Sequence, residues 1–217
     1  AFGFFIVMTW AHWGQGDLYA LLAFARADYL RTTGQRALAA VVRGGLPMLV
    51  PLLAFPEWYR LVARALVSLF ALGSVADLAW AFRADTRLAL GAVYAAVVVG
   101  YFALGYGRAT DADRDALALD AGETVLLGAY FLVVPPVLAV GVYFCVWHAY
   151  RHIARLVLLE PDSRDALADR DLWPALRRFA VEATPLTLVS IALLVGFYFL
   201  VPNPPADILG WVGLYLV

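Results

Sequence analysis

Long apolar runs recur along the whole chain, and they constrain its fold more than any other feature. A helix needs about 20 mostly apolar residues to cross the hydrocarbon core of a bilayer. Runs near this length cover residues 1–25, 39–55, 66–82, 88–106, 124–147 and 186–201. A further apolar segment follows the turn residues 202–205. The pattern predicts an all-α fold, a polytopic transmembrane bundle of about six to seven helices.

The composition agrees with a protein whose solvent is lipid. Of the 217 residues, 64% are hydrophobic and only 15% are charged, which lies outside the range of soluble domains. We find no basic tract suited to nucleic acid, no Gly-rich phosphate loop and no recognisable Ser/His/Asp spacing. The sequence therefore predicts the lipid bilayer as a partner, no nucleic acid, and a multi-pass protein of the cell membrane.

The two ends of the chain bear on its domain organisation. Neither an initiator Met nor a basic flank precedes Ala1, and the last apolar segment stops abruptly at Val217. We expect residues 1–217 to form a single transmembrane domain that is truncated at both ends.

The basic residues predict an orientation. All 16 are arginine, and with the runs above 12 of them fall in residues 26–43, 83–87 and 151–178, which would share one side. The positive-inside rule places that side in the cytoplasm. The Asp-rich stretch 111–120 would then lie outside, where we expect a solvated loop.

Three histidines, His12, His148 and His152, lie in or at the ends of apolar runs. Ionisable groups inside a membrane are costly and are usually functional. His148 and His152 are four residues apart, which places both imidazoles on one face of a helix, near enough to bind one metal ion. The alternative is that each histidine hydrogen-bonds a neighbouring helix. Imidazoles without a thiolate suit iron, copper or zinc, so the pattern leaves the metal open.

Other residues near the histidines are candidates for a supporting role. Asp17 can orient a metal-binding imidazole without binding the metal itself, or it can cap a helix at the membrane interface. The paired Pro135 and Pro136 either only kink a helix or tilt His148 and His152 toward the first helix. Aromatic side chains that can line an apolar tunnel, or anchor at the interface, are Trp10, Trp13, Tyr143, Phe144 and Trp147.

The segments at residues 9–17, 41–58 and 135–152 have distinctive sequences, and together they are similar to the Brp/Blh family of membrane β-carotene dioxygenases. TWAHWGQGD at residues 9–17 resembles one hallmark of that family. PPVLAVGVYFCVWHAYRH at residues 135–152 resembles another, a double Pro followed by an aromatic-rich helix and paired histidines. VVRGGLPMLVPLLAFPEW at residues 41–58 resembles its Arg-Gly segment. Order and spacing agree across most of the chain.

The resemblance implies a non-haem Fe(II) centre whose ligands include His12, His148 and His152, with no catalytic residue beyond the metal centre. It also implies that O₂ cleaves the central double bond of β-carotene to give retinal, the ligand of retinal-binding rhodopsins. The family's earlier Pro-His-Gly motif is missing from this sequence, which we attribute to the truncated N-terminus.

Other membrane proteins share parts of this pattern. A rhodopsin needs a membrane Lys for its Schiff base, and these residues contain no Lys. A membrane di-iron hydroxylase needs many more histidines than three. A non-enzymatic transporter or a haem-binding subunit is the remaining alternative, because paired histidines in a helical bundle also bind haem.

Overall fold

A computed structural model describes residues 2–68, 79–161, 163, 165, 171 and 173–202. This part of the chain contains helices and their connections and no strand, which confirms the all-α prediction. The chain divides into two compact units, Ala1–Arg60 with Leu78–His152, and Leu61–Asp77 with Ile153–Val217.

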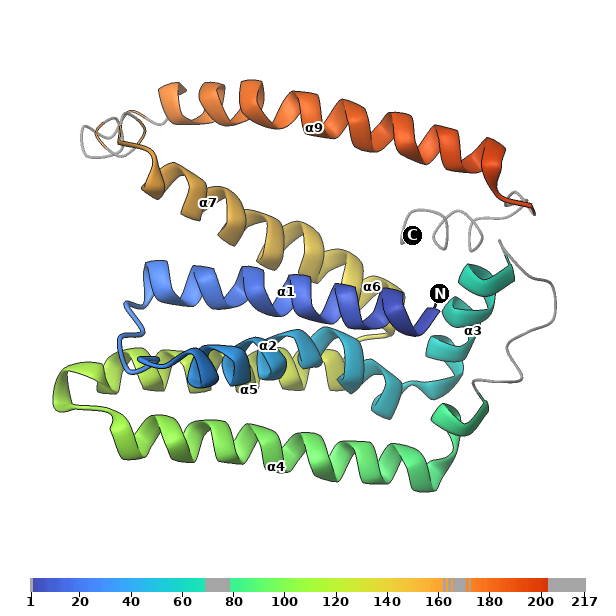
Figure 1. Ribbon diagram of the computed structural model, residues 1–217, viewed down its shortest axis with the longest axis horizontal. Coiled ribbons are helices and arrows are strands. Elements are labelled where there is room, and N and C mark those ends of the chain that lie inside the picture. The colour runs from blue at the N-terminus through green and yellow to red at the C-terminus, as the bar shows by residue number, and fades with distance from the viewer. Residues whose placement is uncertain are drawn as a thin grey trace. The chain divides into compact units, whose positions relative to one another are not determined.

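The first unit is a bundle built around α2 (Figure 1). Helix α2 (Thr33–Ala54) contacts α1 (Phe2–Phe24), α4 (Ala84–Arg108) and α5 (Arg114–Val133). Every residue of α2 from Val42 to Leu52 is buried. The central position of α2 means that any polar group on its inner half must find its partners on α1, α4 or α5.

Local sequence explains how α2 begins and how closely α1 approaches it. Thr32 caps α2: its hydroxyl accepts from the Gln35 backbone N–H, and the Gln35 side chain accepts from the Thr32 backbone. Helix α1 crosses α2 where Gly14 faces Gly44, and a Cβ on either glycine would collide with a backbone oxygen of the facing helix. Small residues at a crossing let two membrane helices pack backbone to backbone.

The protein is a membrane protein by the length and hydropathy of its helices. In the described part of the chain, four segments are long and apolar enough to cross a bilayer: Thr33–Ala54, Ala84–Arg108, Asp111–Val133 and Trp173–Leu200. They contain the predicted run at 88–106 and all but the last residue of the predicted runs at 39–55 and 186–201. Helix α1 is as long but does not meet this criterion, because His12, Gln15 and Asp17 reduce its mean hydropathy. Residues 69–78 of the predicted run 66–82, and the segment after residue 202, lie outside the described residues.

The prediction of one helical run over residues 124–147 is wrong. Helix α5 ends at Val133, and a new helix, α6 (Pro136–Val142), starts after an extended break at Val134 and Pro135. A proline lacks the backbone N–H that the helix needs and forces the preceding residue out of the helical region. The chain then continues through a π-helical turn, η3 (Tyr143–His148), into α7 (Ala149–Leu159).

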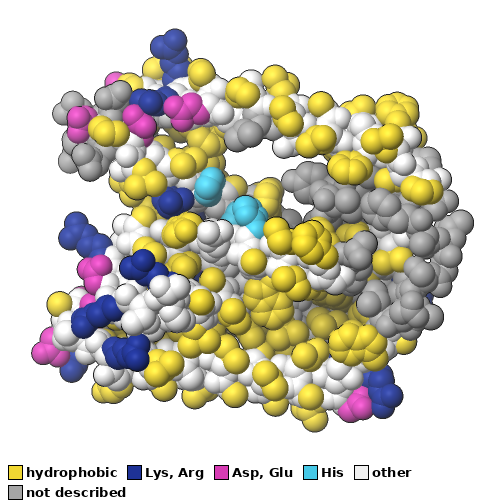
Figure 2. Space-filling view, in the orientation of Figure 1, with side chains coloured by type: hydrophobic (Ala, Val, Ile, Leu, Met, Phe, Trp, Pro, Cys, Tyr) yellow, Lys and Arg dark blue, Asp and Glu magenta, His cyan; other side chains and the backbone are white. Residues whose placement is uncertain are grey.

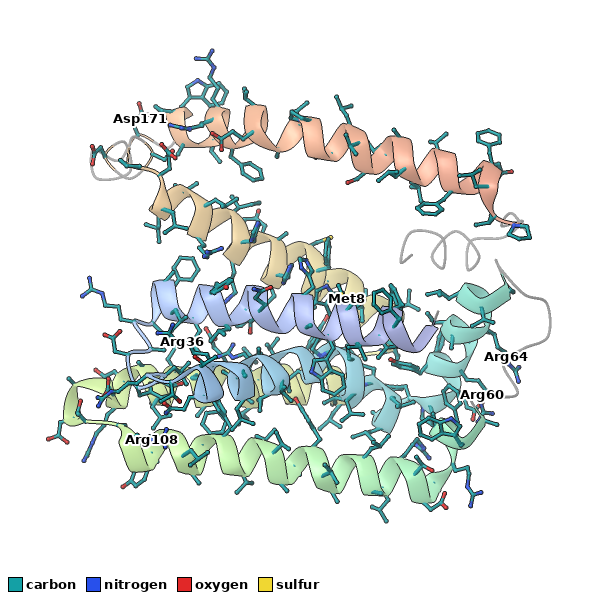
Figure 3. The ribbon with its side chains drawn as sticks, in the orientation of Figure 1. Met8, Arg36, Arg60, Arg64, Arg108 and Asp171 are labelled. Atoms are coloured by element: carbon teal, nitrogen blue, oxygen red, sulfur yellow. The ribbon has the colours of Figure 1, made fainter. Side chains whose placement is uncertain are left out.

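The predicted orientation of the chain is also wrong. The connection at residues 109–113 lies at the same end of the bundle as the α1–α2 connection, because Arg31 pairs with Asp113 at 3.2 Å. The opposite end holds Arg60 and Phe82, whose side chains are in contact. Figure 3 shows Arg36 and Arg108 at one end and Arg60 at the other. Residues 26–43 and 111–120 therefore cannot lie on opposite sides of the membrane.

The Asp-rich stretch is not the solvated loop that the sequence predicts. Asp111–Asp113 form one 3₁₀ turn, η2, and α5 begins directly after it at Arg114. Asp113 and Asp120 are buried, with Asp120 fully inaccessible. The loop was predicted from the high local density of Asp residues. That density does not show that Asp120 faces the inside of the bundle.

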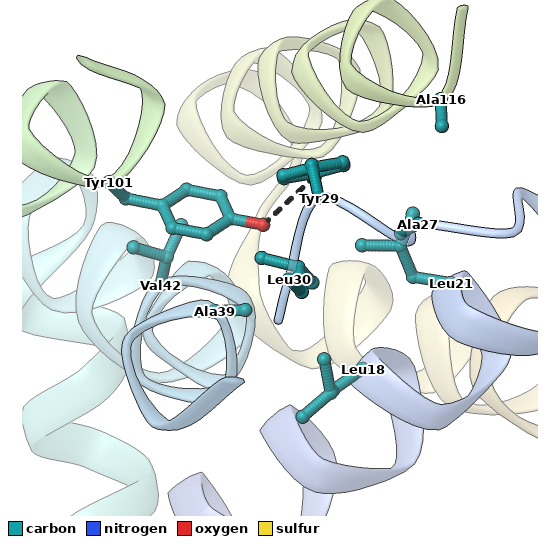
Figure 4. Close-up of a cluster of buried hydrophobic side chains, with 9 residues drawn as sticks. All are labelled: Leu18, Leu21, Ala27, Tyr29, Leu30, Ala39, Val42, Tyr101 and Ala116. Atoms are coloured by element: carbon teal, nitrogen blue, oxygen red, sulfur yellow. Dashed lines mark hydrogen bonds between the residues drawn. The ribbon is translucent and has the colours of Figure 1, made fainter. Parts of the chain in front are cut away.

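An apolar core closes this end of the first unit (Figure 4). It joins side chains of α1, the α1–α2 connection, α2, α4 and α5, among them Leu21, Leu30, Val42, Tyr101 and Ala116. Tyr29 and Tyr101 of this core also donate to Asp120, so the core lies directly beside the polar groups described below.

The second unit contains α3 from Leu61 onward, the end of α7, and α9 (Trp173–Leu200). Helix α3 spans Pro56–Ser68. Within this unit Arg178 pairs with Glu160 and with Glu182, each at 2.9 Å. Thr184 and Thr187 donate to backbone oxygens four residues earlier, which satisfies their hydroxyls without leaving α9.

Candidate functional site

Two of the three histidines come together from segments far apart in sequence. The rings of His12 on α1 and His148 at the end of η3 have centroids 5.8 Å apart at an interplanar angle of 57°. Gly16, one turn after His12, leaves the space that the second ring occupies: a Cβ there would lie 2.8 Å from His148 Cε1. Figure 2 shows histidine side chains on the face of the molecule, bordered by hydrophobic side chains.

Aromatic rings surround the buried side of His148. Phe144 stacks on it with centroids 5.6 Å apart and an angle of 20°, and Tyr143 lies 6.2 Å away. Trp13 of α1 contacts both Tyr143 and Phe144, at 5.8 Å and 6.4 Å. Three of the five predicted tunnel residues thus form one aromatic wall beside the histidine pair.

The other predicted site residues take different positions. His152 lies on α7, one turn beyond His148, and is exposed. Among the described residues no three His, Cys, Asp or Glu side chains gather in a metal-binding group. Trp10 faces α2, where its indole N–H donates to the Val41 carbonyl at 2.8 Å. The indole of Trp147 donates instead to Asp17, at 3.1 Å.

Asp17 belongs to a buried network of charged side chains centred on Arg43. The Arg43 guanidinium is fully buried and pairs with Asp17 at 2.6 Å, with Glu123 at 2.8 Å, and with Asp120. Arg151 of α7 pairs with Glu123 at 2.6 Å, and its Nε lies 3.3 Å from Asp17 without forming an aligned hydrogen bond. The network ties α1, α2, α5 and α7 together.

Two tyrosines complete the environment of Asp120. The Tyr29 hydroxyl donates to Asp120 Oδ2 at 2.5 Å, and the Tyr101 hydroxyl donates to the same oxygen. The two hydroxyls are 3.2 Å apart, the contact drawn in Figure 4. Burial, and then the negative charge of Asp120, raise the pKa of Tyr29 far above its ordinary value. Tyr29 therefore stays protonated and remains a hydrogen-bond donor to the carboxylate.

The network was not predicted from the sequence. Arg43 and Arg151 entered the prediction as markers of orientation and as part of the segments that resemble the family, and Asp120 only as part of a loop. A signal was present, because Arg43 lies inside an apolar run and Asp120 and Glu123 are three residues apart, on one face of a helix. Sequence spacing alone does not show that these charges meet.

Comparison with known proteins identifies the family of this chain. The family model described as beta-carotene 15,15'-dioxygenase matches residues 1–217. The chain belongs to the beta-carotene 15,15'-dioxygenase family. It is 49% identical over 213 residues to the protein named "Probable beta-carotene 15,15'-dioxygenase Blh" from Halobacterium salinarum, which is 98% of this chain and 61% of that protein. It is 41% identical over 193 residues to "Probable beta-carotene 15,15'-dioxygenase Brp" from the same species, which is 89% of this chain and 52% of that protein.

The chain therefore spans about three fifths of the length of the Blh relative and about half that of Brp. No solved structure matches the chain. The Brp/Blh resemblance of residues 9–17, 41–58 and 135–152 is confirmed, and the same segments supply His12, Arg43 and His148 to the site.

The donor set at His12 and His148 is chemically suited to an iron ion. Imidazole is a suitable ligand for iron, and two imidazoles on one ion have ring centroids roughly 5 to 6 Å apart because each metal–nitrogen bond is about 2.0 to 2.1 Å long. The observed 5.8 Å lies in that range. The neighbouring network carries three carboxylates against two guanidiniums, so its net negative charge favours a cation nearby.

Two tyrosines near the site provide a matched test of how their hydroxyls are used. Tyr143 is buried and its hydroxyl has no hydrogen-bond partner among the described residues, whereas the Tyr101 hydroxyl binds a carboxylate. Tyr101→Phe should lower the free energy of unfolding by about 1.5 to 3 kcal/mol, the range for hydrogen bonds to charged groups. Tyr143→Phe should leave it unchanged or raise it.

Thermal unfolding of both purified variants in one detergent measures the difference. A loss for Tyr143→Phe as large as that for Tyr101→Phe would mean that the Tyr143 hydroxyl has a partner in the folded protein.

Proposed function

We propose that the protein to which this chain belongs cleaves the central double bond of β-carotene with O₂ and releases retinal. The observation that carries the proposal is the meeting of His12 and His148 across two distant segments, in a chain of the beta-carotene 15,15'-dioxygenase family. One β-carotene and one O₂ give two molecules of retinal, so all atoms are accounted for. The names of the Halobacterium relatives support the same reaction.

The proposed metal ligands are His12, His148 and His152, with Fe(II) as the cofactor. When bound, the ferrous ion supplies the centre at which O₂ is activated. The chain's own part is to fix the imidazoles. His148 is held between Phe144 on one side and Gly16 on the other, and neutral imidazoles leave the charge of the ion uncompensated.

The aromatic wall accounts for the substrate class. A carotenoid is a long hydrocarbon that partitions into the bilayer, so its site needs an apolar surface that can be reached from lipid. Trp13, Tyr143 and Phe144 present aromatic rings next to His148. Packed against a polyene, such rings exclude water from the reacting double bond.

The proposal includes a place and a destination for the product. We assign the protein to the cell membrane, with its substrate drawn from the bilayer and its retinal available to retinal-binding rhodopsins. The four described segments that are long and apolar enough to cross a bilayer support the membrane assignment in general terms.

Production of the full-length protein in cells that make β-carotene tests the proposal. Retinal should accumulate, and the cells should lose β-carotene colour in proportion. Longer apocarotenals without retinal would contradict central cleavage. A Soret absorbance band in the purified protein, without retinal formation, would instead favour a haem-binding subunit. The absence of both retinal and a Soret band would favour a transporter.

A further inference from the structure

We propose that Asp17 is a positioning residue that fixes His148 through the side chains of Trp147 and Arg151. The inference rests on the proposed function, because it concerns how the metal-binding histidine is held. Asp17 makes no hydrogen bond to His12 or His148 in the described part of the chain. Its two carboxylate oxygens are directed at Arg43 and at Trp147.

Asp17 is itself rigidly held. It is 2% exposed, and its Oδ2 accepts from Arg43 Nη1 at 2.6 Å. Arg43 cannot shift easily, because the same guanidinium also binds Asp120 and Glu123 on α5. The remaining oxygen, Oδ1, is thereby presented at a fixed position toward the π-helical turn.

Oδ1 holds two side chains that flank His148 in sequence. Trp147 donates its indole N–H to Oδ1 at 3.1 Å, and Arg151 Nε lies 3.3 Å from the same atom. The Arg151 guanidinium also lies over the Trp147 ring, 4.8 Å from its centroid. Trp147 immediately precedes His148, and Arg151 follows it by three residues. Because both side chains are fixed, His148 has little freedom to rotate about the helix axis.

The position of the His148 ring depends on the π-helical turn that Asp17 contacts through Trp147. In an α-helix, side chains five residues apart point about 140° apart around the axis. Tyr143 and His148 are five apart, yet their rings are in contact at 6.2 Å, and the Ala149 N–H donates to the Phe144 carbonyl, also five residues apart. The wider turn brings Tyr143 and His148 to one face. Such turns are rare and occur often at functional sites.

Gly16 and Asp17 act as neighbours in this arrangement. Gly16 leaves room for the His148 ring, and Asp17, the next residue on α1, holds the turn that carries the ring. The π-helical turn, held by Asp17, places His148 over Gly16 and beside His12. A regular α-helical turn would rotate His148 away from Tyr143 and from this position.

The test uses Trp147→Phe, which removes the indole N–H and keeps an aromatic ring, in the purified full-length protein. Fe(II) affinity is measured anaerobically by competition with a chelator, together with the thermal midpoint. We expect Fe(II) binding to weaken roughly 10- to 100-fold, the range for groups that orient metal ligands. Trp10→Phe is the matched control, because it removes an indole hydrogen bond between α1 and α2 that does not involve the π-helical turn or Asp17.

Each outcome has a defined meaning. Weaker Fe(II) binding in Trp147→Phe, with Trp10→Phe near wild type and both midpoints similarly reduced, supports the positioning role. Equal Fe(II) affinity in Trp147→Phe and wild type overturns it and leaves the proposed function intact. A wild-type protein that binds no Fe(II) and forms no retinal overturns the proposed function, and the inference with it.

Discussion

Replacing Arg43 by Met should destabilise the protein by about 3 to 5 kcal/mol, the cost typical of removing one partner from a buried ion pair. Arg43 is fully buried in the most buried helix of the bundle, and three carboxylates share its guanidinium. Without it, the network has three negative charges against Arg151 alone. Those charges cannot be solvated inside the bundle, so the folded state loses stability.

Thermal unfolding of the purified variant measures this effect, and a second substitution identifies its cause. Adding Asp120→Asn to Arg43→Met restores the net charge of the network to its original value, so part of the loss should be recovered. Arg108→Met is the control: Arg108 is an exposed side chain at the end of α4 (Figure 3), and its loss should change little. An Arg43→Met protein as stable as wild type would show that the network does not stabilise the fold.

Replacing His148 by Ala should reduce retinal formation to the background, well beyond the roughly 10- to 100-fold effect of groups that only orient a ligand. The substitution removes the imidazole that lies beside His12. The fold should survive, because His148 lies at the edge of the bundle and forms no hydrogen bond or ion pair within the described residues. Retinal formed in cells that make β-carotene is measured together with the amount of folded protein. His12→Ala should have the same result.

Tyr150→Ala is the matched control for this experiment. Tyr150 lies two residues after His148 in the chain and is 68% exposed, so its loss removes a large side chain without touching the histidine pair. Retinal formation near wild type in both histidine variants would place the metal site elsewhere and would favour a haem or transport role. A loss of folded protein in His148→Ala would instead show that the ring is needed for packing.

The buried network and the histidine pair share one design feature: both join α1 to segments more than a hundred residues later. Asp17 meets Trp147 across 130 positions, and His12 lies beside His148. One short stretch of α1 makes three contributions. His12 is a proposed ligand, Gly16 leaves space for the His148 ring, and Asp17 binds Trp147 next to His148. Substitution of Asp17, which binds both Arg43 and Trp147, should therefore affect metal binding and stability together.

Hydropathy, which the sequence carries by itself, was enough to predict the all-α membrane fold and three of the spanning segments, and the resemblance of three short segments predicted the family. These properties are local, because the bilayer requires an apolar run wherever a helix crosses it. The aromatic wall could also be predicted, since Tyr143 and Phe144 are close to His148 in the chain.

Only the tertiary structure decided which charges are buried and what Asp17 does. Asp120 is predicted to lie in a solvated loop, whereas the structure places it inside α5, which begins at Arg114. The contact of Arg60 with Phe82 shows that the chain returns to the same end of the bundle before α4, which reverses the side assigned to residues 111–120. Arg43 meets Asp17 because α1 and α2 cross closely at Gly14 and Gly44, and it meets Asp120 and Glu123 because α2 also packs on α5. Ion pairs between helices depend on rotation and crossing geometry, and neither is set by the order of residues within one helix.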